Sequence, residues 1–226
     1  MDTLFLTINS TYTTLTVAFC KHENVVASIT ESHRHASTHM LLMIDEVLKK
    51  NMATLNDLSY IAVNAGPGPF TTLRTVIATS NGLGYATGLP LIAVNGIAAF
   101  VKEHRQPEFT HTFALLDAFC SDVYFAYYNH AKEVIKDGSC SITTWIEHLR
   151  HFLIENPHAR IKFIGNALSL HQAKIIDAFG TGFIAFEAVP DYPSIDAIKN
   201  AACIAWNNQQ VTQQVIPLYL KEFMVQ

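Results

Sequence analysis

The alternation of apolar and polar residues predicts three short strands at the start of the chain, at positions 4–8, 14–19 and 25–29. The middle stretch alternates most regularly, which is typical of a half-buried strand. From about 37 to 50 the apolar spacing changes to that of an amphipathic helix. The predicted core-facing residues of this helix are Met40, Leu41, Ile44, Val47 and Leu48.

The pattern continues with a strand at 60–63, a helix from about 71 to 87, and a buried strand at 90–94. The polar stretch at 104–108 is typical of a linker, and beyond it strands and helices recur in a similar order. We therefore predict an α/β protein of two related lobes, at residues 1–105 and 106–226. The second lobe is expected to be the smaller and a degenerate copy of the first.

Composition narrows the class of protein. The chain has 226 residues, half of them hydrophobic and 15% charged, which favours a packed globular protein over a disordered one. The formal net charge of −4 gives no basic surface for gripping nucleic acid unaided. Four cysteines lie far apart and form no C-x-x-C pair, and no apolar stretch is long enough to span a membrane. These features predict a cytoplasmic protein with reduced thiols.

Several segments, in the same order, resemble one family of proteins. The most specific is G-P-G-P-F-T-T-L-R at 66–74, where the pattern of the TsaB (YeaZ) family is G-P-G-S-F-T-G-L-R. The other segments are L-T-I-N-S-T at 6–11, L-L-M-I-D-E-V-L at 41–48, G-L-P-L-I-A-V at 88–94 and I-P-L-Y-L-K at 216–221. The resemblance is specific across the first lobe and thin across the second.

The resemblance implies a two-lobed, actin-like ATPase fold, as in sugar kinases and Hsp70. It also implies a role in making threonylcarbamoyladenosine (t6A) on tRNA, beside the catalytic subunit TsaD and the ATPase TsaE. Because this chain lacks a basic surface, tRNA is expected to be held by another subunit of the complex. In this family two helices of the first lobe pair with the equivalent helices of TsaD, or with a second copy of themselves.

At the positions that would hold a nucleotide in an actin-like fold, this chain has residue types that bind metal and phosphate less well. The fold places an Asp after its first strand, and this chain has Asn9, a neutral and weaker partner for a hard cation. Ser10, Thr11 and the residues after them include no glycine for a phosphate-wrapping turn. The interpretation we favour is an ordinary polar hairpin, so no cofactor is expected. Likewise, the two prolines in 66–69 favour a rigid turn over an anion site.

Metal ligands of the catalytic relative are also missing. TsaD carries an H-x-x-x-H pair after the strand that corresponds to 91–94, and this chain reads N-G-I-A-A-F there. A second H-x-x-x-H, formed by His35 and His39 with His33 nearby, lacks the H-E-x-x-H form, and we favour surface histidines over a metal site. In the second lobe, Phe119 replaces the Arg of the family's D-A-R motif, which removes a bidentate anion contact.

What remains is surface that a partner could contact. Leu42 points away from the predicted core stripe of the first helix, and Met43 lies on its flank. In the second helix Ala78, Gly82 and Ala86 form a line of small residues, where an interior glycine costs about 1 kcal/mol against alanine. A close helix along this line would explain that cost, and it belongs either to the same lobe or to a second subunit.

These observations leave three hypotheses for the function of the chain. The first is a non-catalytic subunit that supports TsaD and helps to build a surface for TsaE and tRNA. The second is an active ATP-dependent kinase or transferase of the actin-like fold, which needs a tight site for a magnesium-bound nucleotide. The third is a glycoprotease-like metallopeptidase, which needs metal ligands and a general base. The depleted catalytic inventory favours the first, with no catalytic residue and no metal.

Overall fold

The computed structural model describes residues 2–183 and 190–220, and they form two compact units. The first unit is Met1–Ala99 with Ser194–Leu218, and the second is Phe100–Pro193 with the chain from Tyr219. The predicted division at 105/106 is therefore wrong for the C-terminal part of the chain. Most of that part returns to the first unit.

Hydrogen bonds hold this C-terminal segment against the rest of the first unit. Leu91 and Thr212 exchange two backbone bonds of 2.9 and 2.8 Å, and the side-chain amide of Asn81 both donates to and accepts from the backbone of Val215. These contacts join residues more than 100 positions apart, so no local sequence pattern predicts them. They make the C-terminal segment part of the first unit.

The sheet of the first unit has the strand order β3-β2-β1-β4-β5. Its strands are β1 Leu4–Ser10, β2 Thr14–Lys21, β3 Asn24–Ser32, β4 Tyr60–Asn64 and β5 Leu91–Val94. β1 pairs antiparallel with β2 and parallel with β4, and its central place explains why it is buried almost throughout. β3, at the edge, alternates between half-buried and exposed residues.

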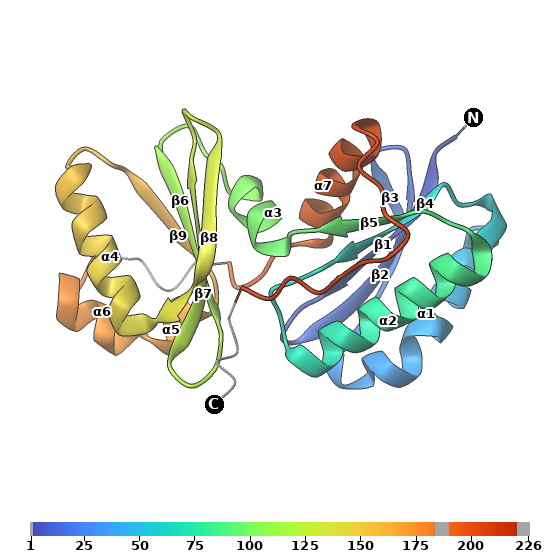
Figure 1. The fold of residues 1–226 in the computed structure, drawn as a ribbon, viewed down its shortest axis with the longest axis horizontal. Helices are drawn as coiled ribbons and strands as arrows, with labels where there is room; N and C mark the ends of the chain where they lie inside the picture. The colour runs from blue at the N-terminus through green and yellow to red at the C-terminus, as the bar shows by residue number, and fades with distance from the viewer. Residues whose placement is uncertain (1, 184–189, 221–226) are drawn as a thin grey trace. The chain divides into compact units, whose positions relative to one another are not determined.

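Two helices cover one face of this sheet and one covers the other (Figure 1). α1 (Ala36–Lys50) and α2 (Phe70–Thr87) lie side by side on the first face, and α7 (Ile195–Asn207) packs on the second. Short 3-10 turns, η1 (His33–His35) and η2 (Leu55–Asp57), precede and follow α1. Gly88 ends α2 in the left-handed conformation, with φ 74°, as a C-terminal glycine is expected to.

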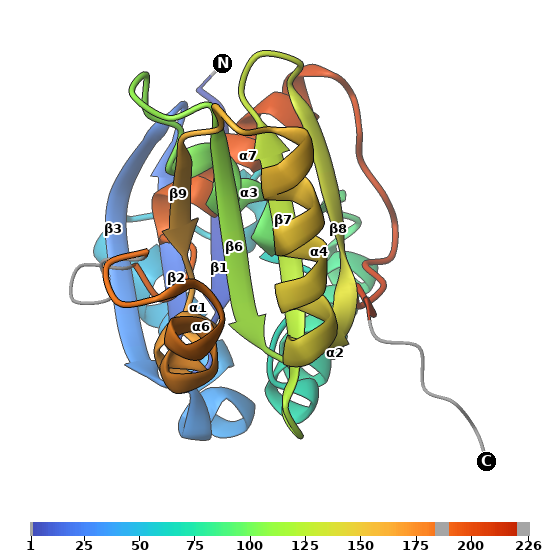
Figure 2. The ribbon, with the colours of Figure 1, turned by 90° about the vertical axis from the view of Figure 1, so that its left-hand side faces the viewer.

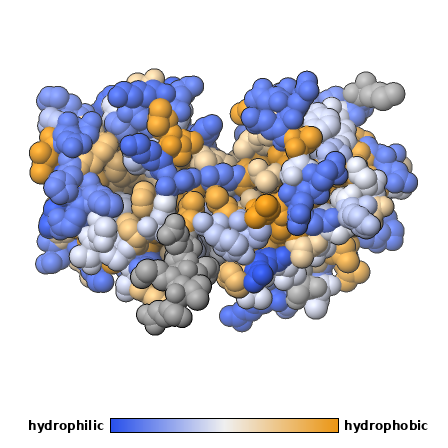
Figure 3. Space-filling model, in the orientation of Figure 1, coloured by the Kyte–Doolittle hydropathy of each residue, from blue (hydrophilic) through white to orange (hydrophobic). Residues whose placement is uncertain are grey.

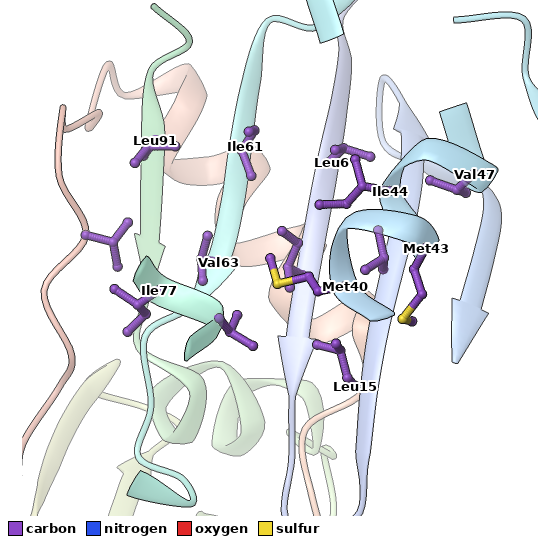
Figure 4. Close-up of a cluster of buried hydrophobic side chains, with 14 of the residues drawn as sticks. Leu6, Leu15, Met40, Met43, Ile44, Val47, Ile61, Val63, Ile77 and Leu91 are labelled. Atoms are coloured by element: carbon purple, nitrogen blue, oxygen red, sulfur yellow. The ribbon is translucent and has the colours of Figure 1, made fainter. Parts of the chain in front are cut away.

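The core stripe of α1 differs from the predicted one by one exchange. Met43 is 2% exposed and points into the cluster formed with β1, β2 and α1 (Figure 4), whereas Leu41 is exposed. The stripe therefore follows i, i+3, i+4, i+7, i+8, the regular helical spacing. Met43 is wrongly predicted as a partner contact because the sequence offered two adjacent apolar residues, and only the helix's rotation decides between them.

In the described residues, the sheet of the second unit has four strands in a similar order, β8-β7-β6-β9. The strands are β6 His111–Asp117, β7 Asp122–Asn129, β8 Val134–Ser141 and β9 Ile161–Ile164. The chain enters this unit within α3 (Gly96–Glu103). α4 (Ile142–Glu155) and α6 (Gln172–Phe179) lie over one face of the sheet (Figure 2), with the short α5 (Ala167–Leu170) between them in sequence. Among the described residues, no helix is long and apolar enough to cross a membrane.

Candidate functional site

The polar residues at the ends of β1 and β4 are buried and bonded to one another. The Nδ2 atom of Asn64, at the end of β4, donates to Oδ1 of Asn9 at 2.8 Å, and the backbone N–H of Gly66 donates to Oδ1 of Asn64 at 2.9 Å. The position at which an Asp is expected in an actin-like fold therefore holds the neutral amide of Asn9, paired with the neutral amide of Asn64. Neutral amides are weak ligands for a magnesium ion, which binds carboxylates and phosphate oxygens more strongly.

The hairpin between β1 and β2 satisfies its own backbone donors. The N–H groups of Thr13 and Thr14 donate to Oγ1 of Thr11 at 3.3 and 3.0 Å, and the N–H of Thr11 donates to the carbonyl of Thr14 at 2.8 Å. No residue from 10 to 14 has a positive φ. The hairpin is thus a self-contained polar turn, and these amides are already taken rather than offered to a phosphate.

Ser10 is the exception within this loop. Its hydroxyl oxygen is buried and has no hydrogen-bond partner among the described residues. The residue itself is 2% exposed. A buried hydroxyl without a partner costs stability, because it has lost water without replacement.

Backbone hydrogen bonds to two other segments hold the loop before α2 in place. The carbonyl of Gly66 accepts from the N–H of Gly96, and the carbonyl of Ala65 accepts from the N–H of Leu218, both at 2.8 Å. Pro69 is the N-cap of α2 and has no side-chain cap bond. The loop is therefore a fixed strand-to-helix connection, as predicted.

The stretch that holds the histidines in TsaD is packed here. Ile97 and Phe100 are buried in the core, and Gly96 lies so close to Asn64 that an added Cβ would meet Oδ1 of Asn64 at 2.3 Å. Asn95 uses its Oδ1 to accept from the N–H of Ala98 at 3.0 Å. None of residues 95–100 offers an imidazole, thiolate or carboxylate to a metal.

The outer surface of α1 exposes two adjacent leucines. Leu42 is 64% exposed, as predicted, and Leu41 joins it in place of Met43. Exposed aliphatic side chains are common singly, but two neighbours on one helix make an apolar patch. Figure 3 shows apolar residues reaching the surface of the first unit between polar ones.

The outer surface of α2 is open along the predicted line of small residues. Ala78, Gly82 and Ala86 are all exposed, and a Cβ added at Gly82 would meet no atom within 4 Å. By contrast, a Cβ added at Gly84 would lie 3.0 Å from Leu91. Packing within the chain therefore explains Gly84 and leaves Gly82 unexplained. Of the two alternatives left by the sequence, a helix of the same unit is excluded in the described part of the chain.

Sequence reasoning missed two aromatic residues on the same helix. Tyr85 is 93% exposed, three positions after Gly82, and Phe70 is exposed at the first turn, where the Arg74 guanidinium stacks 4.8 Å from its ring centre. The helical spacing from Gly82 to Tyr85 was the available signal. We call the exposed residues Leu41, Leu42, Ala78, Gly82, Tyr85 and Ala86 the docking face.

Two other predicted positions lie apart from this face. Phe119 is more than half exposed at the β6–β7 turn, where it, Cys120 and Ser121 all have positive φ, so the residue in place of the family's Arg is a surface residue. At the start of α1, His35 and His39 gather around Glu31 of β3. His33 is not part of that group.

Comparison with known proteins gives a consistent result. The sequence model of the family described as TsaD, tRNA N6-adenosine threonylcarbamoyltransferase, matches residues 23–209. The chain is 25% identical over 171 residues to the tRNA threonylcarbamoyladenosine biosynthesis protein TsaB of Buchnera aphidicola subsp. Acyrthosiphon pisum (strain APS), covering 75% of this chain and 77% of that protein. It is also 25% identical over 185 residues to TsaB of Bacillus subtilis (strain 168), covering 79% and 78%.

A solved structure agrees in fold. The crystal structure of an uncharacterized Pseudomonas aeruginosa protein with similarity to peptidase YEAZ is similar with a TM-score of 0.75 and 20% identity. The match covers 97% of this chain and 100% of that chain. Together with the strand orders of the two sheets, it confirms the predicted α/β fold, in which each of two units has a mixed sheet with helices.

Proposed function

The chain belongs to the TsaB (YeaZ) branch of the TsaD family, the tRNA N6-adenosine threonylcarbamoyltransferases, and we propose that it is a non-catalytic subunit of t6A synthesis. In this role it binds a TsaD-like catalytic subunit through the docking face on α1 and α2. The complex acts in the cytoplasm, and a TsaE-like ATPase and tRNA join it through surfaces that the two subunits build together.

The observation that carries the proposal is the open glycine on α2. An interior helical glycine costs roughly 1 kcal/mol relative to alanine, and at Gly82 no atom of the described chain makes use of the missing Cβ. A glycine lets the backbone of a second helix approach closely. With alanine one turn before it and one turn after it, the exposed line suits a helix supplied by another chain.

The state of the nucleotide loop supports a non-catalytic role. The side chains of Asn9 and Asn64 are neutral amides, and the backbone N–H groups of the β1–β2 hairpin form hydrogen bonds within the turn. Residues 95–100 offer no metal ligand. A kinase or transferase of this fold would need a charged metal ligand and free amides at these positions. The chemistry is therefore assigned to the partner subunit.

The same face also suits a second copy of this chain. A two-fold dimer would place α2 against α2, so that each Gly82 approaches its equivalent. Such a homodimer would compete with the heterodimer, because both use the docking face. Free subunits in excess would then be stored as homodimers.

The role is tested by measuring threonylcarbamoyl transfer to tRNA with the purified chain, with TsaD from the same organism, and with both. We expect no turnover by the chain alone and faster turnover by the mixture than by TsaD. Transfer by the chain alone, or micromolar binding of magnesium-ATP with turnover, would contradict the proposal and favour the kinase or transferase hypothesis.

A further inference from the structure

Three potential metal ligands meet at the junction of β3 and α1. Nδ1 of His39 lies 2.5 Å from Oε2 of Glu31, and Nδ1 of His35 lies 3.9 Å from the same oxygen. One ligand atom from each of the three residues lies within 4.8 Å of the other two. The docking face does not include any of them.

The fold brings the group together from two elements. Glu31 is the penultimate residue of β3, on the strand face where Ala27 and Ile29 pack beneath α1. A carboxylate at the end of an apolar strand face needs a polar partner. The turn η1 reverses the chain, so that His35, the N-cap of α1, and His39, one turn further on, lie over Glu31. Their ring centres are 5.0 Å apart.

The sequence signal was present but has an unusual form. The spacing is E-x-x-x-H-x-x-x-H, with the carboxylate before the two histidines rather than between them. A search for H-E-x-x-H therefore misses it, because that form assumes all three residues on one helix. Here the first residue is on a strand.

We propose that Glu31, His35 and His39 form a binding site for a divalent transition-metal ion, with zinc as the ion. Two imidazoles and one carboxylate are a ligand set that suits zinc, whereas magnesium and calcium require mostly oxygen ligands. Around one tetrahedral zinc, with bonds of about 2.0–2.2 Å, ligand atoms lie about 3.3–3.5 Å apart. The observed separations bracket this value, so small side-chain rotations bring the atoms into place.

The site leaves one coordination position to solvent. The side chains of Glu31, His35 and His39 are 34%, 58% and 42% exposed, so water can reach the ion and complete a tetrahedral shell. Between the histidines stand Ala36, Ser37 and Thr38, and no residue there can act as a general base. The site therefore binds an ion that ties the edge strand to the start of α1, and it is not a peptidase centre.

The proposal is tested by isothermal titration calorimetry of zinc chloride into the full chain after treatment with a chelator. We expect one ion per chain, and visible d–d bands of a four-coordinate ion when cobalt replaces zinc. Zinc at about 100 times its dissociation constant is expected to raise the unfolding temperature by about 5–10 °C. No binding, or weak binding of several ions without a cobalt spectrum, would overturn the proposal.

Single substitutions test which residues bind the zinc ion. Mutating a residue that only hydrogen-bonds to a metal ligand typically lowers metal affinity roughly 10–100-fold. His35→Gln and Glu31→Gln each remove a ligand, so each is expected to lower zinc affinity by at least that much. His158→Gln, which changes an exposed histidine of the second unit, is the control and should bind zinc as the wild type does. His35 makes the longer contact and is the most exposed, so H35Q should fold even if E31Q does not. Unchanged affinity in H35Q would overturn the assignment.

Discussion

The loop after β1 and the outer face of α2 lie in the same unit, but they differ in how far the chain uses them itself. Beside the loop, Asn64 donates to Asn9 and Gly96 packs directly against Asn64, while the threonine turn of the loop forms hydrogen bonds within itself. On α2, nothing in the described chain approaches Gly82. The polar groups at the end of β1 are used within the chain, whereas the surface at Gly82 is left open.

The largest expected effect separates the core of α1 from its outer surface. Met43→Ala should lower the free energy of unfolding by about 2–5 kcal/mol, because it leaves a cavity in the buried cluster. Leu42→Ala should change it by no more than about 0.5 kcal/mol, because the side chain is exposed. Urea unfolding of the two variants checks the difference. Equal losses would mean that the helix is rotated from the position described.

A second prediction concerns the two glycines that define the comparison. Gly96→Ala should destabilise the chain by about 2–4 kcal/mol, because its Cβ would displace the Asn64 amide that holds Asn9 and Gly66. Thermal unfolding with circular dichroism measures the loss. A neutral effect would show that the loop can rearrange, and the interpretation that its polar groups are used within the chain would then fail.

The matched change on the open face should have the opposite sign. Gly82→Ala is expected to stabilise the isolated chain by about 0.5–1 kcal/mol, because alanine favours the helix and its Cβ meets no atom within 4 Å. The same thermal measurement applies. Destabilisation would indicate an unseen contact at this position within the chain.

The smallest expected effect distinguishes the two units by pH. Burial lowers the pKa of His104, His111, His130 and His171, all in the second unit. A group with a lowered folded pKa stays neutral while the unfolded chain takes up protons. Stability is therefore retained above about pH 6.5 and lost as pH falls from there through the folded pKa values.

Each unit contains one tryptophan with which to follow this loss. Trp145 is buried in the second unit, and Trp206 of α7 stacks on Tyr60 in the first, with ring centres 4.6 Å apart. In a W206F variant, urea unfolding followed by Trp145 fluorescence should need less urea at pH 5 than at pH 7. An unchanged midpoint would contradict the role of the buried histidines.

Local patterns predicted most elements of the first unit and the exposure of Leu42, but they left open whether a helix of the same unit covers Gly82. They could not place Met43, because two adjacent apolar residues on a helix differ only in rotation. They could not return α7 and residues 208–218 to the first unit, because those contacts, such as Leu91 with Thr212, are long-range. Glu31 was missed for a related reason, since a strand residue meets two helix residues only after the chain turns.

The central claim is that the open face of α2 is where a partner binds. The most direct measurement is light scattering of the chain mixed with TsaD from the same organism, for the wild type, Gly82→Arg and Ile154→Arg, the last being an exposed residue of α4 in the second unit. We predict a heterodimer for the wild type and I154R and separate subunits for G82R. A heterodimer that persists in G82R, or none with the wild type, would contradict the claim.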